Sequence, residues 1–468
     1  MSADSHLPTP VPGSITTAGR YIILLTAFLG WLCAGMQMSI TSVAMRSAAK
    51  DLLSQTGSID REKFNELSAA SKQQTPDATS GDTQTEDKKQ LEGWRGIIAR
   101  WFAWYLCAFL FGAAAGGLIF GKMGDRIGRS KAMAASILCY SLVSGAAYFA
   151  QTPMQLLVLR FVACMGVGGM WPNGVALVSE AWANMSRPMV SGVIGTAANV
   201  GIFLLATIAA YIPVTDLDWR WVMLVGASPA LLGLIALFAV PESPRWLAAR
   251  NGKADSDDAT KTAPASGVFS SPFLKVTLVG ILLATVPLMG GWGSANWMIP
   301  WAGEAGEAAD PQNPFLKAHV VMARSLTGIV GSLLGGWIGS FIGRRTAYFI
   351  VSLAALFCAQ YAFWFTIPTD EAFLYWVGAL GFFSGIYFGW LPLFLPELFP
   401  TRVRATGAGV SFNFGRILTA TTIVATGALM QYFAGDYAKI GRLTSLIYLV
   451  GAVIIWFAPD TSRRQLED

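Results

Sequence analysis

The stretch GKMGDRIGRSK, residues 121–131, decides the fold, because this short charged segment separates two long apolar runs. WFAWYLCAFLFGAAAGGLIF (residues 101–120) precedes it, and AMAASILCYSLVSGAAYFA (residues 132–150) follows it. Its three glycines allow a tight turn between closely packed helices, and its basic residues hold that turn at a membrane surface. The segment therefore predicts a hairpin of two membrane-spanning helices.

Asp125 is the residue of this turn that simple anchoring does not explain. A carboxylate in this place pairs with the neighbouring arginines, or it faces the N-terminus of another helix across an interface. Either contact could form in one conformation and break in another, so Asp125 is a candidate for a gate.

The composition supports a chain that lies mostly in lipid. Of its 468 residues 54% are hydrophobic and only 13% are charged, whereas soluble domains carry about a quarter charged residues. Windows long enough to span the hydrocarbon core recur about twelve times. We therefore predict an all-α membrane protein with 12 transmembrane helices, at residues 21–46, 98–120, 132–150, 155–181, 189–211, 221–240, 274–300, 317–339, 347–367, 373–395, 408–431 and 441–458.

The short loops alternate in charge, which predicts the orientation. Lys and Arg gather in every second loop, and Asp and Glu dominate the others. The positive-inside rule then places the basic loops and both termini in the cytoplasm. The formal charge of +5 follows from this pattern and does not indicate nucleic-acid binding. The five cysteines all lie in apolar runs, so we expect buried thiols and no disulfides.

The two halves of the chain repeat one another. The segment Gly121–Arg129 recurs as Gly336–Arg344, and two later Glu–Arg pairs share one spacing. Two six-helix pseudo-repeats are typical of secondary transporters. The predicted organisation is a cytoplasmic tail (1–19), an N-terminal half (20–247), a cytoplasmic linker (248–272) and a C-terminal half (273–468).

Residues 47–96 form a predicted outer loop within the N-terminal half. Its piece KQQTPDATSGDTQTEDKKQ (72–90) looks disordered by composition, whereas residues 46–55 and 61–70 are predicted short helices. A loop of this length could recognise something, but a solvated insertion is the simpler interpretation.

Five segments together resemble the major facilitator superfamily, over nearly the whole chain. They are the turn at 121–131, RFVACMGVGG (160–169), PESPRWL (241–247), PELFPTRVRATG (396–407) and PDT (459–461). The resemblance is to the sugar-porter and metabolite (aromatic acid) symporter branches. It implies the superfamily fold and a network of ion pairs that opens and closes the cytoplasmic side. By this resemblance the gate residues are Asp125, Arg126, Arg129, Glu180, Arg187, Glu242, Arg245, Glu397, Arg402 and Arg404. The second turn has Ser340 and Phe341 in place of the charged pair, so we expect an asymmetric gate.

Ionisable residues inside the spans are expensive and are by default functional candidates. Arg416 lies about 14 Å from the inner end of its predicted span, and Arg324 about 18 Å. We predict that Arg416 binds a substrate carboxylate, with Arg324 as a second candidate. The alternative is a structural arginine bonded to carbonyls. Arg160 is expected near the outer face, where it could snorkel.

Further candidates for substrate contact are polar or aromatic residues in the spans. Trp171 and Asn173 follow the glycine motif, and Asn296 and Trp297 lie in the seventh span; both pairs resemble the metabolite symporter branch. Trp390 and Asn413 complete the set. Packing or hydrogen bonding between helices explains each of them equally well.

The first span departs from the pattern that the resemblance implies. Proton symporters of these branches carry an aspartate where this chain has Gln37. We expect Gln37 at about the same depth in the membrane as Arg160. An amide does not exchange protons near neutral pH. Coupling would then use another group such as His319, another ion such as sodium, or none.

These observations predict a multi-pass inner-membrane transporter of a small organic solute that works by alternating access, with carboxylates as the favoured substrate class. A neutral-sugar facilitator and a non-transporting sensor of the same fold are the alternatives. The sequence has no metal-ligand cluster, phosphate-binding loop or catalytic nucleophile, so we predict no enzyme, no catalytic residue, no metal and no cofactor. The expected partners are the substrate, the bilayer and a co-transported proton or sodium ion.

Overall fold

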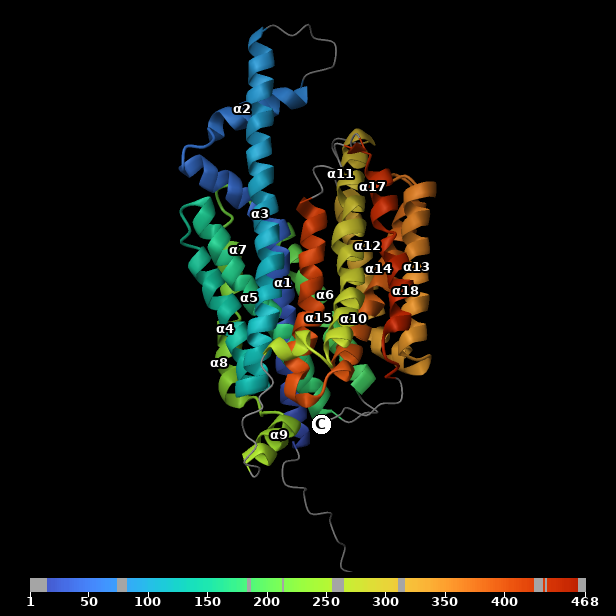
Figure 1. Cartoon of the computed structure of the whole chain (residues 1–468). Coiled ribbons are helices and arrows are strands. Elements are labelled where there is room, and N and C mark those ends of the chain that lie inside the picture. Colours follow the sequence, from blue (N-terminus) through green and yellow to red (C-terminus); the bar gives the residue numbers. More distant parts are fainter. Residues whose placement is uncertain are drawn as a thin grey trace, which may run out of the picture.

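The chain forms a bundle of long, roughly parallel helices in a computed structural model (Figure 1). The structure describes residues 15–73, 82–182, 187–212, 214–254, 265–309, 316–424, 432–433 and 436–461. Within these ranges the regular elements are all helical. The helices are α1 (Thr17–Gln55), α2 (Arg61–Gln73), α3 (Asp82–Ile127), α4 (Arg129–Ala147), α5 (Pro153–Ala181), α6 (Arg187–Tyr211), α7 (Trp221–Ala227), α8 (Ala230–Ala239), α9 (Pro244–Ala254), α10 (Leu274–Leu288), α11 (Met298–Ala309), α12 (Leu316–Phe341), α13 (Arg344–Phe365), α14 (Glu371–Phe394), α15 (Arg404–Val424), α17 (Tyr437–Thr444) and α18 (Ile447–Ile454). Short helical turns join them: η1 (Ala265–Phe269), η2 (Met289–Ser294), η3 (Ala295–Trp297), η4 (Leu395–Leu398), η5 (Thr401–Val403) and η6 (Ile455–Phe457).

Ten stretches of the described helices are long and apolar enough to cross a membrane. The helices α4 and α15 lie among them and complete the twelve predicted spans. Two spans are interrupted: α7 and α8 share one, and α10 passes through η2 and η3 into α11. The five thiols are free as predicted, although Cys33, Cys107 and Cys139 are only partly buried.

The helices from the two parts of the chain lie side by side (Figure 1). Helices α1 to α8, blue to green, form one group, and α10 to α18, yellow to red, form the other. The groups meet where α3 packs on α15 and where α6 packs on α12 and α14. We call the end of the bundle that carries Asp125, Glu180, Glu242 and Arg404 the charged end; α2 lies at the opposite end.

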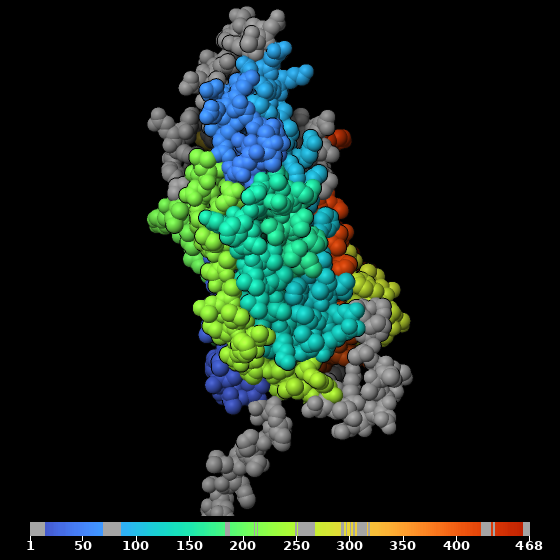
Figure 2. Space-filling model, turned by 90° about the vertical axis from the view of Figure 1, so that its left-hand side faces the viewer, coloured from blue at the N-terminus to red at the C-terminus, as the bar shows by residue number. Residues whose placement is uncertain are grey.

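At the opposite end the predicted loop 47–96 is largely helical, which corrects the expectation. The helix α1 runs on to Gln55, and α3 already begins at Asp82, so most of the stretch expected to be disordered is helix; residues 74–81 lie outside the described ranges. The predicted helix at 61–70 is confirmed as α2. Figure 2 shows this part, in blue, standing on the α4–α5 face.

We call the described residues of 47–96 the outer part, because they extend beyond the bundle. The buried carboxylate of Asp51 holds this part together. It pairs with Arg61 at the start of α2 and with Arg220 before α7 (Nη1 to Oδ2, 2.9 Å). The indole of Trp219 donates to the same oxygen at 3.0 Å. Because these partners come from α1, α2 and the segment before α7, the outer part is fastened to the N-terminal group of helices.

The helices α12 and α14 approach each other at glycines. A Cβ added at Gly331 or Gly335 would lie 2.0 or 2.3 Å from a carbonyl oxygen of α14, and one at Gly385 or Gly389 would lie 2.2 or 2.0 Å from a carbonyl oxygen of α12. The two backbones are therefore in direct contact along several turns, as small residues allow in membrane helices.

Candidate functional site

The first glycine turn places Arg129 inside the protein. Gly128 has a φ of 113°, which favours glycine, and it ends the path from α3 into α4. The Arg129 side chain is fully buried, and its Nη1 donates to the carbonyl of Gly124 at 2.8 Å. Its Nη2 donates to the carbonyl of Thr401, which belongs to the C-terminal group of helices.

Asp125 faces the N-terminus of α15, which is one of the two contacts predicted for it. Its carboxylate accepts hydrogen bonds from the backbone N–H groups of Ala405 (3.2 Å) and Thr406 (2.9 Å) and from the Thr406 hydroxyl. The predicted pairing with a neighbouring arginine is also present, because Asp125 Oδ1 lies 3.1 Å from Arg129 Nη2. Asp125 thus fastens α3 to α15 through the unpaired N–H groups of a helix start.

A second contact between the two groups is the ion pair of Glu180 with Arg404. Arg404 Nη1 donates to Glu180 Oε1 at 2.8 Å, and both side chains are fully buried. The other carboxylate oxygen of Glu180 lies 3.4 Å from Arg129 Nε and accepts from Ser243. One acid therefore lies between two arginines, one from each group.

Glu242 holds the start of α4. Its carboxylate accepts from the backbone N–H groups of Arg129 (2.9 Å), Ser130 (3.2 Å) and Ser243 (2.9 Å). Burial raises the pKa of Glu242, and these three N–H groups act in the opposite direction. The contact links residues of the N-terminal group only.

The second turn repeats this backbone geometry, with Ser340 in the place of Asp125. Gly343 has a φ of 89°, and Arg344 Nη1 donates to the carbonyl of Gly339 at 2.8 Å. Arg344 pairs with Glu397 (3.1 Å), which also accepts from Thr461. Ser340 donates back to Gly336 within α12. The two turns therefore differ at this position, because Asp125 binds the N-terminus of α15 whereas Ser340 bonds within α12.

The remaining gate candidates are less engaged or are not described. Arg126 is exposed at the end of α3, and Arg402 is exposed with its guanidinium 5.6 Å from the ring centroid of Phe273. Arg245 lies close enough to Arg404 to act on it electrostatically. The side chain of Arg187 lies outside the described residues.

Arg416 is buried between aromatic rings where the two groups of helices meet. It lies twelve residues after Arg404 on α15, about 18 Å along the helix and deeper than the sequence predicted. Its side chain is 3% exposed, and neither Nε nor Nη1 has an acceptor among the described residues. The guanidinium lies 5.1 Å from the ring of Phe109 on α3 and 5.4 Å from that of Phe412.

The rings around Arg416 continue into an aromatic cluster. Phe412 stacks on Trp171 with centroids 4.2 Å apart, and both contact Trp31 of α1 at 6.4 and 6.5 Å. The structure thus joins two predicted residues, Trp171 and Arg416, through one that sequence reasoning missed. The spacing of Phe412 one turn before Arg416 was a usable signal; Trp31 and Phe109 come from distant helices and left none.

Gln37 and Arg160 belong to one hydrogen-bond network, in which the cationic Arg160 binds neutral acceptors. The Gln37 amide donates to the carbonyls of Gly226 (2.7 Å) and Tyr140 (3.4 Å), and its oxygen accepts from Ser144 (2.8 Å) and Arg160 (3.3 Å). Arg160 also donates to the carbonyl of Gln37 at 3.0 Å. The predicted proximity is confirmed. The expected snorkelling is wrong, because Arg160 is fully buried by this network.

The two asparagine candidates serve contacts between helices. Asn173 donates to the carbonyls of Phe120 (3.0 Å) and Gly169 (2.8 Å). Asn413 donates to Gly168 of α5 (2.9 Å) and to Gly409 (3.1 Å), so it connects the two groups of helices. These are the helix–helix bonds that the sequence left open as the alternative.

The other substrate candidates lie apart from the Arg416 cluster in their contacts. Arg324 donates to the carbonyl of Gly291 in η2 at 3.0 Å, and Trp297 packs on Tyr437. Trp390 donates from its indole to the carbonyl of Arg344 at 3.1 Å and stacks on Phe394, so it belongs to the second turn. The side chain of Asn296 lies outside the described residues.

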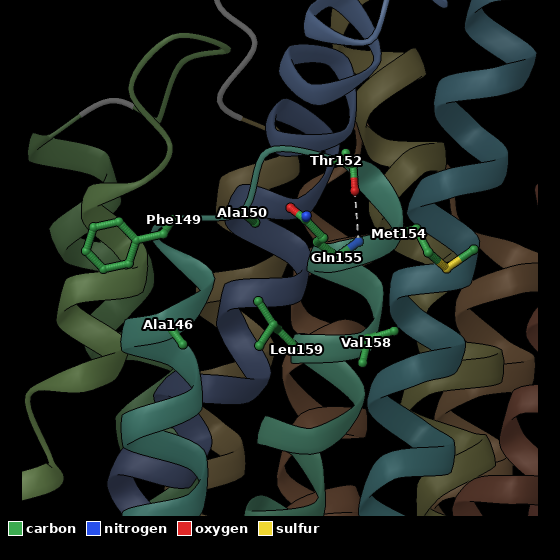
Figure 3. A pocket seen from close by; sticks show the side chains of 8 residues that line it. All are labelled: Ala146, Phe149, Ala150, Thr152, Met154, Gln155, Val158 and Leu159. Atoms are coloured by element: carbon green, nitrogen blue, oxygen red, sulfur yellow. Dashed lines mark hydrogen bonds between the residues drawn. The ribbon is translucent and has the colours of Figure 1, made fainter.

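A groove of about 550 Å³ lies at the α4–α5 connection (Figure 3). Its lining is apolar apart from Thr152 and Gln155, and Phe149, Met154 and Val158 are exposed on it. The lining comes from one hairpin and carries no charged residue, so this groove has no means of holding an ionic substrate between the two groups of helices.

Comparisons with known proteins agree with this architecture. The sequence is 28% identical over 323 residues to the cis,cis-muconate transport protein of Acinetobacter baylyi, covering 68% of this chain and 76% of that one. It is 26% identical over 364 residues to a putative niacin/nicotinamide transporter of Bacillus subtilis (76% and 86%) and 25% identical over 322 residues to the sialic acid transporter NanX of Escherichia coli (69% and 75%).

Solved structures show the same fold at low identity. The proton:xylose symporter XylE has a TM-score of 0.68 at 16% identity, covering 96% of this chain and 97% of that one. The human organic anion transporter MFSD10 has a TM-score of 0.63 at 14% identity (93% and 99%). The sequence model described as Major Facilitator Superfamily matches residues 27–422. The chain therefore belongs to the major facilitator superfamily, and it is a multi-pass membrane transporter of small organic solutes that works by alternating access.

Proposed function

We propose that this transporter carries small organic carboxylates and that Arg416 binds the carboxylate. The observation that carries this proposal is the burial of an arginine whose Nε and Nη1 have no acceptor among the described residues. A buried guanidinium without hydrogen-bond acceptors is costly, and a carboxylate satisfies two of its N–H groups at once. The rings of Phe109 and Phe412 add an apolar wall that excludes water from the pair.

The names of the relatives support the same substrate class. Muconate, niacin and sialic acid are carboxylic acids of different size and shape, and their transporters are 25–28% identical to this chain. A shared carboxylate is the chemical feature that one arginine could recognise in all three. We further place the protein in the bacterial inner membrane, in line with the Escherichia coli relative named as an inner-membrane metabolite transport protein.

The charged end is proposed to face the cytoplasm and to act as the gate. Lys122, Arg126 and Lys131 are at this end, which agrees with the positive-inside rule. The contacts of Asp125 with α15 and of Glu180 with Arg404 would break when residues 20–247 and 273–468 rock apart at this end. The linker 248–272 would connect the two moving halves.

Thermal stability of the purified protein tests the carboxylate proposal. Nicotinate, cis,cis-muconate, glucose and xylose are added at increasing concentration to wild type and to Arg416→Gln. A ligand at 100 times its Kd adds about 2.7 kcal/mol to the free energy of unfolding, so a binding carboxylate raises the Tm measurably. We expect such a rise for at least one carboxylate with wild type, and at least a tenfold weaker response with Arg416→Gln.

The ligand-free variants distinguish a binding arginine from a structural one. Removing an uncompensated buried charge leaves the Tm of Arg416→Gln equal to or above that of wild type. Arg324→Gln is the matched control, because Arg324 donates to a backbone carbonyl and should lower the Tm without affecting carboxylate binding. A Tm rise from sugars alone would replace the proposal with that of a neutral-sugar facilitator.

A further inference from the structure

The charge of Arg416 has no counter-charge in the membrane interior. Within the twelve apolar ranges of the sequence the only Asp or Glu is Glu180, and it lies at the charged end between Arg129 and Arg404. Arg160 and Arg416 both act electrostatically on the thiol of Cys164 on α5, so this region holds two cations. The centre of the molecule therefore carries uncompensated positive charge.

No group near this centre is suited to load and release a proton at neutral pH. Gln37 replaces a possible acid with an amide, and all of its described contacts are to neutral groups and Arg160. Tyr140 donates to the carbonyl of Gly30 and remains a phenol. The acid of the opposite end, Asp51, is already paired, and His319 is exposed at the start of α12.

The charge has opposite consequences for the loaded and the unloaded transporter. Arg416 is 3% exposed in this structure, and opening of either end of the bundle would admit water to it. When the two halves close again, that hydration is lost, and the Nε and Nη1 groups need acceptors that the described protein residues do not supply. A bound carboxylate supplies it, whereas an unloaded transporter would have to close on a bare cation.

We propose that this protein is an obligatory anion exchanger: each half-cycle carries a carboxylate, and the return step proceeds only with a second carboxylate on Arg416. The inference rests on the proposed function, because it requires Arg416 to bind the substrate. It goes further in excluding proton-driven and facilitative net uptake, the two modes that the fold alone leaves open.

Uptake into proteoliposomes tests the exchange. The labelled probe is whichever of nicotinate and cis,cis-muconate gives the larger thermal shift. Vesicles contain either the same unlabelled carboxylate or potassium chloride, and protein-free vesicles give the passive background. We expect uptake to be at least tenfold faster into carboxylate-loaded vesicles. An acidic exterior or a valinomycin-imposed potential should not raise uptake into chloride-loaded vesicles above that of Arg416→Gln.

A variant that supplies an internal counter-charge sharpens the test. Cys164→Asp puts a carboxylate beside Arg416, and Cys164→Asn is its neutral control. We expect Cys164→Asp to weaken probe binding at least tenfold and to lose the advantage of loaded vesicles, while Cys164→Asn keeps both. If either aspartate or asparagine prevents folding, the wild-type comparison decides alone.

The outcomes separate the two proposals. Gradient-driven uptake into chloride-loaded vesicles at a rate close to that of exchange would overturn obligatory exchange and leave carboxylate transport intact. If neither carboxylate shifts the Tm or is transported, carboxylate transport fails and obligatory exchange fails with it.

Discussion

The two glycine turns of this protein have the same backbone and different partners. In each, a glycine of positive φ precedes a buried arginine, whose Nη1 donates at 2.8 Å to the carbonyl five residues earlier. In the first turn Asp125 and Arg129 reach the other group of helices. In the second, Ser340 donates to Gly336 within α12, and Arg344 pairs with Glu397 of the same group.

This difference shows that the repeated motif has two separable parts. The glycine and the arginine build the turn, and that part is kept in both copies. The residue four positions before the arginine differs: it is Asp125 in the first turn and Ser340 in the second. A carboxylate at this position decides whether the turn also fastens the two groups together. Exchanging residues between the copies therefore tests local stability and gating independently.

The largest effect is expected from the two buried glutamates, Glu180 and Glu397. Replacing either by Gln leaves arginines buried without their acid, and breaking such a pair costs about 3–5 kcal/mol. We expect both variants to lower the Tm. Glu180→Gln should also open the charged end, because the pair of Glu180 with Arg404 crosses the interface.

Cysteine labelling measures the opening. Ala408→Cys places a reporter on a fully buried position of α15, in a background without the five natural cysteines. Maleimide labelling should accelerate at least tenfold in Glu180→Gln and less in Glu397→Gln, because the pair of Glu397 with Arg344 lies within one group. Equal acceleration in both variants would show that the second turn gates as well.

An intermediate effect is expected from the glycines of the turns. Gly128→Ala and Gly343→Ala each force a non-glycine residue into positive φ, at a cost of about 1–3 kcal/mol. Gly128→Ala should be the worse of the two, because its Cβ would lie 2.1 Å from Glu242 Oε2. Thermal unfolding of the two variants checks the order; the reverse order would mean that Glu242 moves aside freely.

The smallest change in stability is expected from exchanging the deciding residue itself. Asp125→Ser makes the first turn resemble the second and removes a helix cap worth about 0.5–2 kcal/mol. It should accelerate labelling at Ala408→Cys. Ser340→Asp, the reciprocal change, should leave labelling unchanged, because Ser340 bonds to Gly336 within α12; slower labelling would show that a new contact forms.

The fold could be predicted wherever the signal was local. Apolar length and charged turns predicted the twelve spans. Asp125 was expected either beside an arginine or at a helix N-terminus, because a lone acid in a basic turn has few other roles. The outer part could not be predicted, because α1 extends through Asp51, whose partners Trp219 and Arg220 lie about 170 residues away. From composition alone, such a segment is predicted to be a solvated loop.

The candidate site was predicted in part, for a similar reason. Arg416 stood out because a charge in an apolar run is visible in the sequence, and Trp171 because it follows a motif. The rings of Trp31 and Phe109 belong to α1 and α3, where aromatic residues are common and packing is their ordinary role. Arg160 was misplaced, since its nearness to Gln37 was expected but not the hydrogen bonds that let it stay buried.

The glycine contacts between α12 and α14 have a mechanical consequence. With the two backbones touching at Gly331, Gly335, Gly385 and Gly389, neither helix has room to slide or roll against the other. The two helices therefore act as one rigid pair. Any rocking of the C-terminal helices must turn α12 and α14 together against α6. We therefore expect the pivot of the transporter along α6, where Gly192 contacts α12 and Gly195 contacts α14.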